Sequence, residues 1–273
     1  MIFLHSVWDT FCASLNQRSI PASDLMKEQS SHFLVLKHDV ETNVKKAFRI
    51  AEIEHKYGHR GSYYVQAYLL KDRKNIALLQ QMQAMGHEIS YHYDVLDSCK
   101  GDMDLAMQEY ADNVALFESN GFPVETVCQH GNPVVERRGY SSNRDFYRNE
   151  RVQAAYPHTA DIMVDFPAKA NVKYLYFSDA GRQFQLIYDP LENDRIPSDD
   201  KNTKVGTMEE LAAYAERENC IISIHPHRWS RSKILYWIRG AAFKVIRQTA
   251  KLMLKIPFMR KLMGRYFYLA KKI

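Results

Sequence analysis

Four short segments of the sequence combine histidines with carboxylates or amides, the side chains that bind metal ions and transfer protons. They are His38-Asp39-Val40-Glu41, Tyr91-His92-Tyr93-Asp94, Gln129-His130-Gly131-Asn132 and His225-Pro226-His227-Arg228-Trp229. Imidazoles and carboxylates together suit a borderline divalent cation such as zinc. A carboxylate and an imidazole that are not ligands can serve as base and acid toward water at such a metal. These residue types therefore predict a metal-dependent hydrolytic site.

Each segment also has an ordinary interpretation. A single histidine is more often a structural residue than a ligand, and Asp39 and Glu41 could cap a helix that begins near Val44. Their position favours the functional interpretation, because each segment follows an apolar run expected to be a strand. The carboxyl ends of parallel strands meet at one edge of a sheet, where α/β proteins carry their sites. We therefore expect the four segments to share one site.

The elements that would position these segments alternate between strands and helices. Short apolar runs predict strands at 33–36, 62–65, 88–91, 126–128, 173–177 and 221–224. Amphipathic spacing predicts helices at 44–57, 75–85, 105–119 and 208–218. Residues 137–171 are expected to form an irregular loop over the site. The alternation indicates an α/β fold with a parallel sheet, either open or closed into a barrel.

Composition and motifs exclude several classes of protein. The chain has 273 residues, of which 46% are hydrophobic and 25% charged, so it should form a sizeable core. It contains no GxSxG, GxxxxGK[ST] or GxGxxG segment, which argues against serine-hydrolase and nucleotide chemistry. Its four cysteines are widely spaced, which argues against a disulfide scaffold. We see no signal peptide and no apolar run long enough to span a membrane. These features predict a cytoplasmic protein, free or attached to the inner face of the cytoplasmic membrane.

The basic charge is concentrated at the carboxyl end. Residues 231–273 contain twelve Lys and Arg and no Asp or Glu, whereas residues 1–230 carry a net charge of −7. We therefore divide the chain into a folded domain, 1–230, and a basic amphipathic helical tail, 231–273. The tail either lies on an anionic membrane surface or packs its apolar face on the domain. Specific binding of nucleic acid is not expected.

Three motifs, LKHDVETN, GHEISYHYDVL and IHPHRW, resemble those of polysaccharide deacetylases, the NodB-homology or carbohydrate esterase family 4 group. More closely, the chain is similar to a divergent bacterial subgroup with an HGNP-type segment and a DTGRxW-like segment, the latter present here as residues 178–184. The resemblance covers residues 33–230. It implies a distorted (β/α)7 barrel of the NodB-homology type. It also implies metal-dependent removal of an acetyl group from a sugar of a glycan or of a lipid-linked surface-polysaccharide precursor.

The resemblance also implies the roles of individual residues. Asp39 would be the general base, and His225 would be the general acid. Glu41 and His92 would bind a divalent metal, which we expect to be zinc. Residues expected to contact the sugar are Tyr93, Asp94, Asn132, Arg144, Asp179, Arg182, His227 and Trp229.

The sequence departs from the family pattern at two places. The second histidine of the family's HxxxH ligand pair would fall at Leu96, which cannot bind metal. We expect His130 to supply the third ligand, with Asp94 in reserve. The family's RxPY segment is absent, so Arg182 or Arg144 is expected to orient the base. The departure at Leu96 also leaves an alternative, a catalytically degenerate barrel that binds a glycan at the membrane periphery without hydrolysing it.

Overall fold

The computed structural model describes residues 2–28, 30–132, 135–180, 183–195, 202–238 and 240–241. Its strands are β1 (Leu34–Val40), β2 (Gly61–Val65), β3 (Glu88–Tyr93), β4 (Thr126–Gln129), β5 (Ala160–Asp161), β6 (Leu175–Ser178), β7 (Gln185–Leu186), β8 (Thr203–Lys204) and β9 (Cys220–Ile224). Its α-helices are α1 (His5–Ser14), α2 (Ala22–Lys27), α3 (Val44–Lys56), α4 (Arg73–Ala84), α5 (Val95–Ser98), α6 (Met103–Ser119), α7 (Arg144–Tyr147), α8 (Glu150–Ala155), α9 (Phe166–Lys169) and α10 (Met208–Arg217). Two 3-10 helices are η1 (Ala67–Lys71) and η3 (Pro226–Arg228). The predicted mixture of strands and helices is confirmed.

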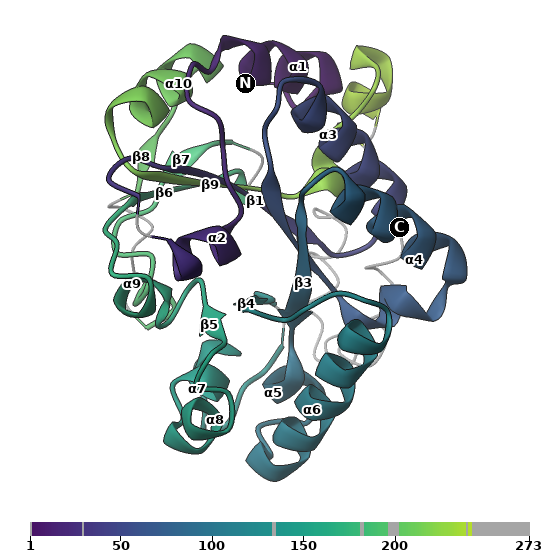
Figure 1. Ribbon diagram of the computed structural model, residues 1–273, viewed down its shortest axis with the longest axis vertical. Helices are drawn as coiled ribbons and strands as arrows, with labels where there is room; N and C mark the ends of the chain where they lie inside the picture. Colours follow the sequence, from purple (N-terminus) through teal and green to yellow (C-terminus); the bar gives the residue numbers. More distant parts are fainter. Residues whose placement is uncertain are drawn as a thin grey trace.

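All described strands belong to one sheet, in the order β5-β4-β3-β2-β1-β9-β6-β7-β8. The strands from β5 to β6 pair in parallel, and β7 and β8 are added in antiparallel register. The strands follow a curve that has α2 on its inner side (Figure 1). Within the described part of the chain no ladder joins β5 to β6, so the predicted closed barrel of seven units stays a prediction.

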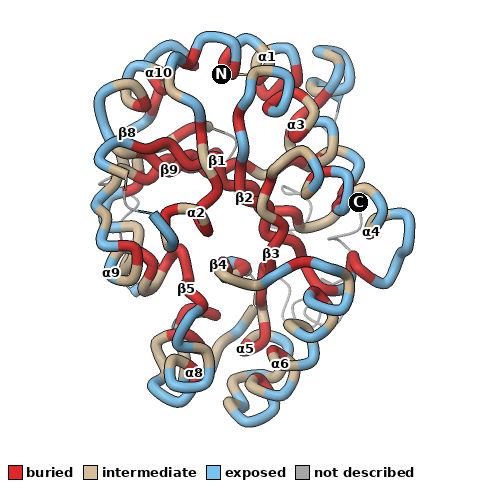
Figure 2. The backbone as a smooth tube through the Cα atoms, in the orientation of Figure 1, coloured by how far each residue is buried: buried red, intermediate tan, exposed pale blue. Residues whose placement is uncertain are grey.

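The sheet separates an inner core from two outer ones. Along β1, Leu34 and Leu36 pack outward beneath α1 and α10, whereas Val35 packs inward, as expected of alternating side chains on a strand. Helices α3, α4 and α6 cover the outer side of β2, β3 and β4. Figure 2 shows the strands buried and the outer surfaces of these helices exposed.

The helices begin where the sequence supplies capping side chains. Asn43 accepts a hydrogen bond from the backbone N–H of Lys46 at the start of α3. Asp102 and Thr207 cap α6 and α10 in the same way. Because α3 follows β1 after three residues, this cap sets the direction in which the chain leaves the strand that carries Asp39 and Glu41.

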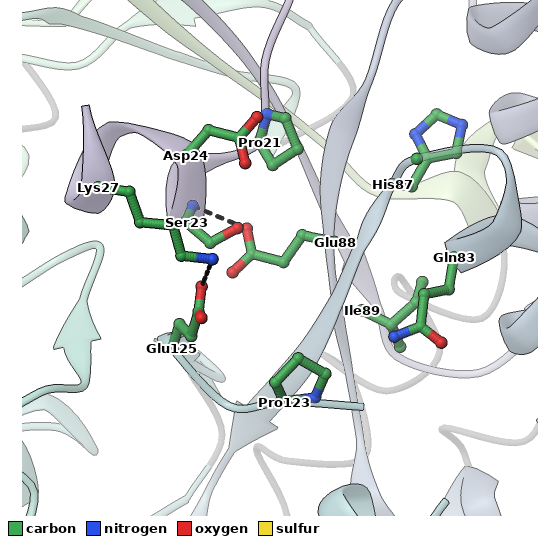
Figure 3. Close-up of a pocket in the computed structure, with 11 residues that line it drawn as sticks. Pro21, Ser23, Asp24, Lys27, Gln83, His87, Glu88, Ile89, Pro123 and Glu125 are labelled. Carbon is green, nitrogen blue, oxygen red and sulfur yellow. Dashed lines mark hydrogen bonds and ion pairs between the residues drawn. The ribbon is translucent and has the colours of Figure 1, made fainter. Parts of the chain in front are cut away.

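Helix α2 covers the amino ends of the strands. The backbone N–H of Ala22 donates to Ser62 Oγ over 2.8 Å, and that of Ser23 donates to Glu88 Oε2 over 3.2 Å. Figure 3 shows Glu88 facing α2 beside the ion pair of Lys27 and Glu125, around a cavity of about 160 Å³. This end lies opposite the carboxyl ends of the strands, where the four predicted segments are.

The predicted tail lies mostly outside the described residues, which include only 231–238 and 240–241 of it. Residues 233–238 are helical. No helix in the described part of the chain is both long and apolar enough to cross a membrane.

Asp161, at the end of β5, is a fully buried acid on the outer side of the sheet. Its carboxyl group accepts hydrogen bonds from Tyr93 Oη and from the backbone N–H of Met163, each over 2.6 Å. Burial raises the pKa of Asp161 to about 7, although these two hydrogen bonds act to lower it. The folded protein therefore keeps a proton that the unfolded chain releases near pH 4. The resulting stabilisation is present below about pH 4 and is lost as the pH rises through about 7.

We predict that Asp161→Asn stabilises the protein at pH 8, because an amide can donate to Tyr93 Oη and accept from Met163 without carrying charge. The gain in free energy of unfolding should be on the order of 1–4 kcal/mol, since one pKa unit corresponds to about 1.4 kcal/mol. Urea unfolding at pH 8 and pH 5 measures it, and the gain should shrink at pH 5. The exposed acid Asp104, changed to Asn, should alter stability by less than about 0.5 kcal/mol at both pH values. An equal effect of Asp161→Asn at the two pH values would contradict the raised pKa.

Candidate metal and acid–base site

The inner side of the sheet carries charged side chains near the carboxyl ends of its central strands. Lys37 and Asp39 lie two residues apart on β1 and therefore share one face. Their side chains form an ion pair of 2.5 Å, and Lys37 Nζ also donates to Ser223 Oγ on β9 over 3.2 Å. Lys37 is 1% exposed, so it reaches Asp39 from inside the fold and not from solvent.

Lys37 fixes the charge of Asp39. Burial by itself would raise the pKa of this carboxyl group, but the ammonium group of Lys37 outweighs it, and the pKa of Asp39 lies well below its ordinary value. In the same pair, burial would lower the pKa of Lys37, and the charge of Asp39 raises it instead. One oxygen of Asp39 is thus held by Lys37, and the other, Oδ2, faces His225 at 3.8 Å.

Glu41, His92 and His130 bring their ligand atoms within 4.8 Å of one another. His92 Nδ1 lies 3.0 Å from the Cys128 carbonyl oxygen, which can only accept, so the proton is on Nδ1 and the Nε2 lone pair is available. His130 Nδ1 lies 3.2 Å from that Nε2 atom and 3.4 Å from Glu41 Oε1. In one tautomer His130 Nδ1 donates to Glu41, and in the other, with the proton on Nε2, it offers a third lone pair beside those of His92 and Glu41. The donor set of two imidazoles and one carboxylate fits zinc or a similar divalent ion.

Hydrogen bonds to the main chain of His130 hold this candidate ligand in place. The His130 N–H donates to the Tyr93 carbonyl over 2.7 Å, and Asn143 Nδ2 donates to the His130 carbonyl over 2.9 Å. Burial lowers the pKa of His92 to about 3, so its ring is neutral at physiological pH. Burial opposes ionisation of Glu41, but the hydrogen bond from His130 and the nearby imidazoles hold its pKa well below the ordinary value.

A second group, Asp39, His92 and Cys128, also lies within 4.8 Å. It is a poorer donor set. Burial raises the pKa of the Cys128 thiol, which disfavours the thiolate that binds metal. Asp39 is already paired with Lys37 at 2.5 Å. The group of Glu41, His92 and His130 is therefore the better candidate for holding a metal ion.

Asp179 and His225 form a hydrogen-bonded pair beside these ligands. Asp179 follows β6 and His225 follows β9, and His225 Nδ1 donates to Asp179 Oδ1 over 2.5 Å. The His225 backbone N–H and Arg228 also donate to Asp179, over 3.1 Å each. Asp179 is fully buried, and although burial opposes its ionisation, His225 and Arg228 lower its pKa. The ring of His225 is thus oriented with Nε2 3.8 Å from Asp39 Oδ2 and 3.7 Å from Glu41 Oε1.

His227 lies next to His225 and Glu41. Its Nδ1 atom is 3.9 Å from Glu41 Oε2, its ring packs edge-on against His225, and burial lowers its pKa to about 4. Tyr68 of η1 also reaches the site, where its hydroxyl donates to the Glu41 carbonyl over 2.5 Å while the residue as a whole is 42% exposed. Tyr68 thus presents an aromatic face at the rim of the site.

Several residues predicted to contact the sugar lie elsewhere. Tyr93 faces the outer core and donates to Asp161, because it follows His92 by one residue and so points to the opposite side of β3. Trp229 is fully buried and stacks on Phe3. Arg144 binds the carbonyls of Pro190 and Leu191. Its predicted role of orienting Asp39 is wrong, because Lys37 has that position.

The remaining predicted residues have mixed outcomes. Asp94 is half-buried and accepts a hydrogen bond from Gln66 over 3.4 Å, and the Asn132 carbonyl accepts one from Arg137. Leu96 is 1% exposed in the core beneath α6, so it does not enter the site. Arg182 lies outside the described residues. Sequence reasoning missed Lys37, although its spacing of two residues from Asp39 on a strand was a usable signal.

Comparisons with known proteins add no assignment: no family model matches the chain, and no curated protein matches it.

We predict that His130→Ala weakens zinc binding by about tenfold or more, because it removes one of three converging ligands. Cys128→Ser should leave zinc affinity within about threefold, since the hydrogen bond to His92 comes from the backbone carbonyl. Competition with a chromophoric chelator measures both affinities, and elemental analysis gives the stoichiometry. If Cys128→Ser were the more damaging change, the metal would belong to the group that contains Asp39.

Proposed function

We propose that the protein is a metal-dependent hydrolase that removes an acetyl group from a sugar of a glycan or of a lipid-linked surface-polysaccharide precursor. One observation carries the proposal: a carboxylate held by Lys37 and an imidazole held by Asp179 face each other beside a ligand set of two histidines and one glutamate. The family resemblance of the sequence motifs supplies the substrate class. Four unpaired cysteines support a reducing compartment such as the cytoplasm.

We also propose that the curved sheet is a distorted (β/α)7 barrel. Ala160 of β5 and Tyr176 of β6 belong to the same inner core. The Tyr174 hydroxyl, just before β6, donates to the Ile162 carbonyl, just after β5, over 3.0 Å. Side chains thus bridge the two strands that no ladder joins in the described residues. Such an arrangement supports a barrel whose closure is made by packing.

Asp39, His225 and Asp179 would each have a separate role in amide hydrolysis. When bound, a divalent cation supplies Lewis-acid polarisation of the acetyl carbonyl and favours ionisation of water. Asp39 Oδ2 accepts the proton of the attacking water as the new C–O bond forms. His225 in its protonated form gives the Nε2 proton to the sugar nitrogen as the C–N bond breaks. Acetate and the free amine leave, and Asp179 keeps the ring of His225 oriented throughout.

The alternative of a degenerate glycan-binding barrel has less support. It depended on the missing ligand at Leu96, and His130 occupies a position that fits a third ligand. The base and acid positions are also filled, by Asp39 and His225. Binding of acetylated sugars without release of acetate would favour this alternative.

We predict that Asp39→Asn lowers acetate release by about 100-fold or more, because a general base contributes about 10²–10⁴-fold. Zinc content should stay near that of the unchanged protein, because Asp39 is not a ligand. His92→Ala should lose zinc and activity together. A panel of N- and O-acetylated sugars, including lipid-linked ones, with acetate as the readout, provides the measurement.

The control addresses the buried partner of Asp39. In Asp39→Asn the ammonium group of Lys37 is left without a carboxylate, which destabilises a buried charge. The double variant Lys37→Met/Asp39→Asn removes both charges, and we expect it to fold, bind zinc and lack activity. Zinc loss in this folded double variant would show that Asp39 is a ligand. Acetate release at the original rate would show that Asp39 is not the base.

A further inference from the structure

A ridge of exposed apolar side chains lies on the helical segment after η3. Ile234, Leu235, Trp237 and Ile238 are 71, 46, 62 and 59% exposed. At 100° per residue these four cover about 160° of the helix. Tyr236, on the opposite side, packs against the core under α1 and α10. Tyr236 thus attaches the segment to the fold, and the four exposed side chains form an apolar face on its other side.

A basic groove borders this ridge. It has a volume of about 500 Å³ between α3 and the segment, and its lining includes Lys45, Lys46, Arg49, Phe48, Arg231 and Leu235. Arg49 is paired with Glu52 over 3.1 Å. In the described part of the chain, Lys45, Arg231 and the neighbouring Lys233 have no ion-pair partner, and all three are exposed. Positive charge therefore lies directly beside the apolar ridge.

We propose that the ridge and the groove together dock on an anionic lipid bilayer. Large apolar side chains, with a tryptophan among them, enter the boundary between headgroups and acyl chains, while basic side chains contact lipid phosphates. The twelve basic and no acidic residues of 231–273 add attraction of the same sign. A second copy of the chain is a poorer occupant, because a two-fold interface would place this basic surface against itself. The proposal is independent of the enzymatic one, since it requires no sugar.

The first test is co-sedimentation of the full chain with vesicles of phosphatidylcholine containing a quarter phosphatidylglycerol. We expect binding at 50 mM salt, weak binding to pure phosphatidylcholine, and loss of binding at 0.5 M salt, where the Debye length falls to about 4 Å. Lys45→Glu/Arg231→Glu should weaken binding by at least about 25-fold, because loss of the two positive charges alone costs about fivefold each and the new carboxylates are repelled by the anionic lipid. Ile234→Ser/Trp237→Ser should weaken it on the order of tenfold.

Matched controls change the same residue types elsewhere on the surface. Leu105 of α6 is 60% exposed, and α6 lies at the other end of the molecule from α1 (Figure 1). Leu105→Ser and Lys100→Glu, the latter at an exposed position just before α6, should leave vesicle binding within about twofold. If the ridge and groove variants also bound like the unchanged protein, the docking surface would be overturned and binding would belong to the rest of the tail. Failure of the full chain to bind anionic vesicles would overturn it as well.

A second measurement reports on insertion directly. The chain has three tryptophans, and Trp8 and Trp229 are fully buried, so Trp237 is the one positioned to meet lipid. Its fluorescence should shift to shorter wavelength on anionic vesicles and be quenched by brominated acyl chains. Trp237→Phe should remove the quenching and keep the binding. A dimer that Ile234→Ser/Trp237→Ser dissociates, without any lipid quenching in the unchanged protein, would show a second copy on the ridge and refute the membrane proposal.

Discussion

The candidate site depends on one buried ion pair, that of Lys37 and Asp39. A carboxylate inside a curved sheet lacks the solvation that would keep it charged, and burial alone would favour its neutral form. The ammonium group of Lys37 lies 2.5 Å from Asp39 Oδ1 and keeps the carboxylate charged, while it contacts only this one of the two carboxylate oxygens. The other oxygen stays directed at His225. A carboxylate that is charged, oriented and buried is therefore a consequence of a side chain two residues earlier on the same strand.

The opposite face of β1 is held by a second buried acid. His38 points outward between Asp39 and Lys37, and its Nε2 atom lies 2.9 Å from Glu54 Oε1 of α3. Glu54 also accepts hydrogen bonds from Trp8 of α1 and Tyr63 of β2. A shift of β1 by one residue would exchange the two faces and separate both acids from their partners. Polar contacts on both sides thus specify the register of the strand that carries the site.

The regular elements follow closely from the sequence. The strand expected at 88–91 is Glu88–Tyr93, and the helix expected at 208–218 is Met208–Arg217, because apolar spacing and capping residues are local signals. The irregular loop expected at 137–171 is only partly right. It contains the two-residue strand β5 and the short helices α7, α8 and α9, which are too short to show a period. The amino-terminal helices α1 and α2 were not predicted, because their place is set by packing on strands distant in the sequence.

The sequence predicted which residues belong to the site better than it predicted the role of each one. Position at strand ends was enough to group Asp39, Glu41, His92, His130 and His225, which the structure brings together. Which neighbour points inward was harder to predict, as Tyr93 and Trp229 illustrate. Asp179 was expected to contact the sugar and instead orients His225, a relation between β6 and β9 that no local pattern contains.

The two carboxylates of the site have separate partners: Lys37 neutralises Asp39, whereas imidazoles surround Glu41. Because burial keeps His92 and His227 neutral down to about pH 3 and 4, the imidazoles around Glu41 do not all carry charge at neutral pH. A neutral imidazole has a lone pair to offer, so the same burial that favours the uncharged ring also prepares His92 as a metal ligand.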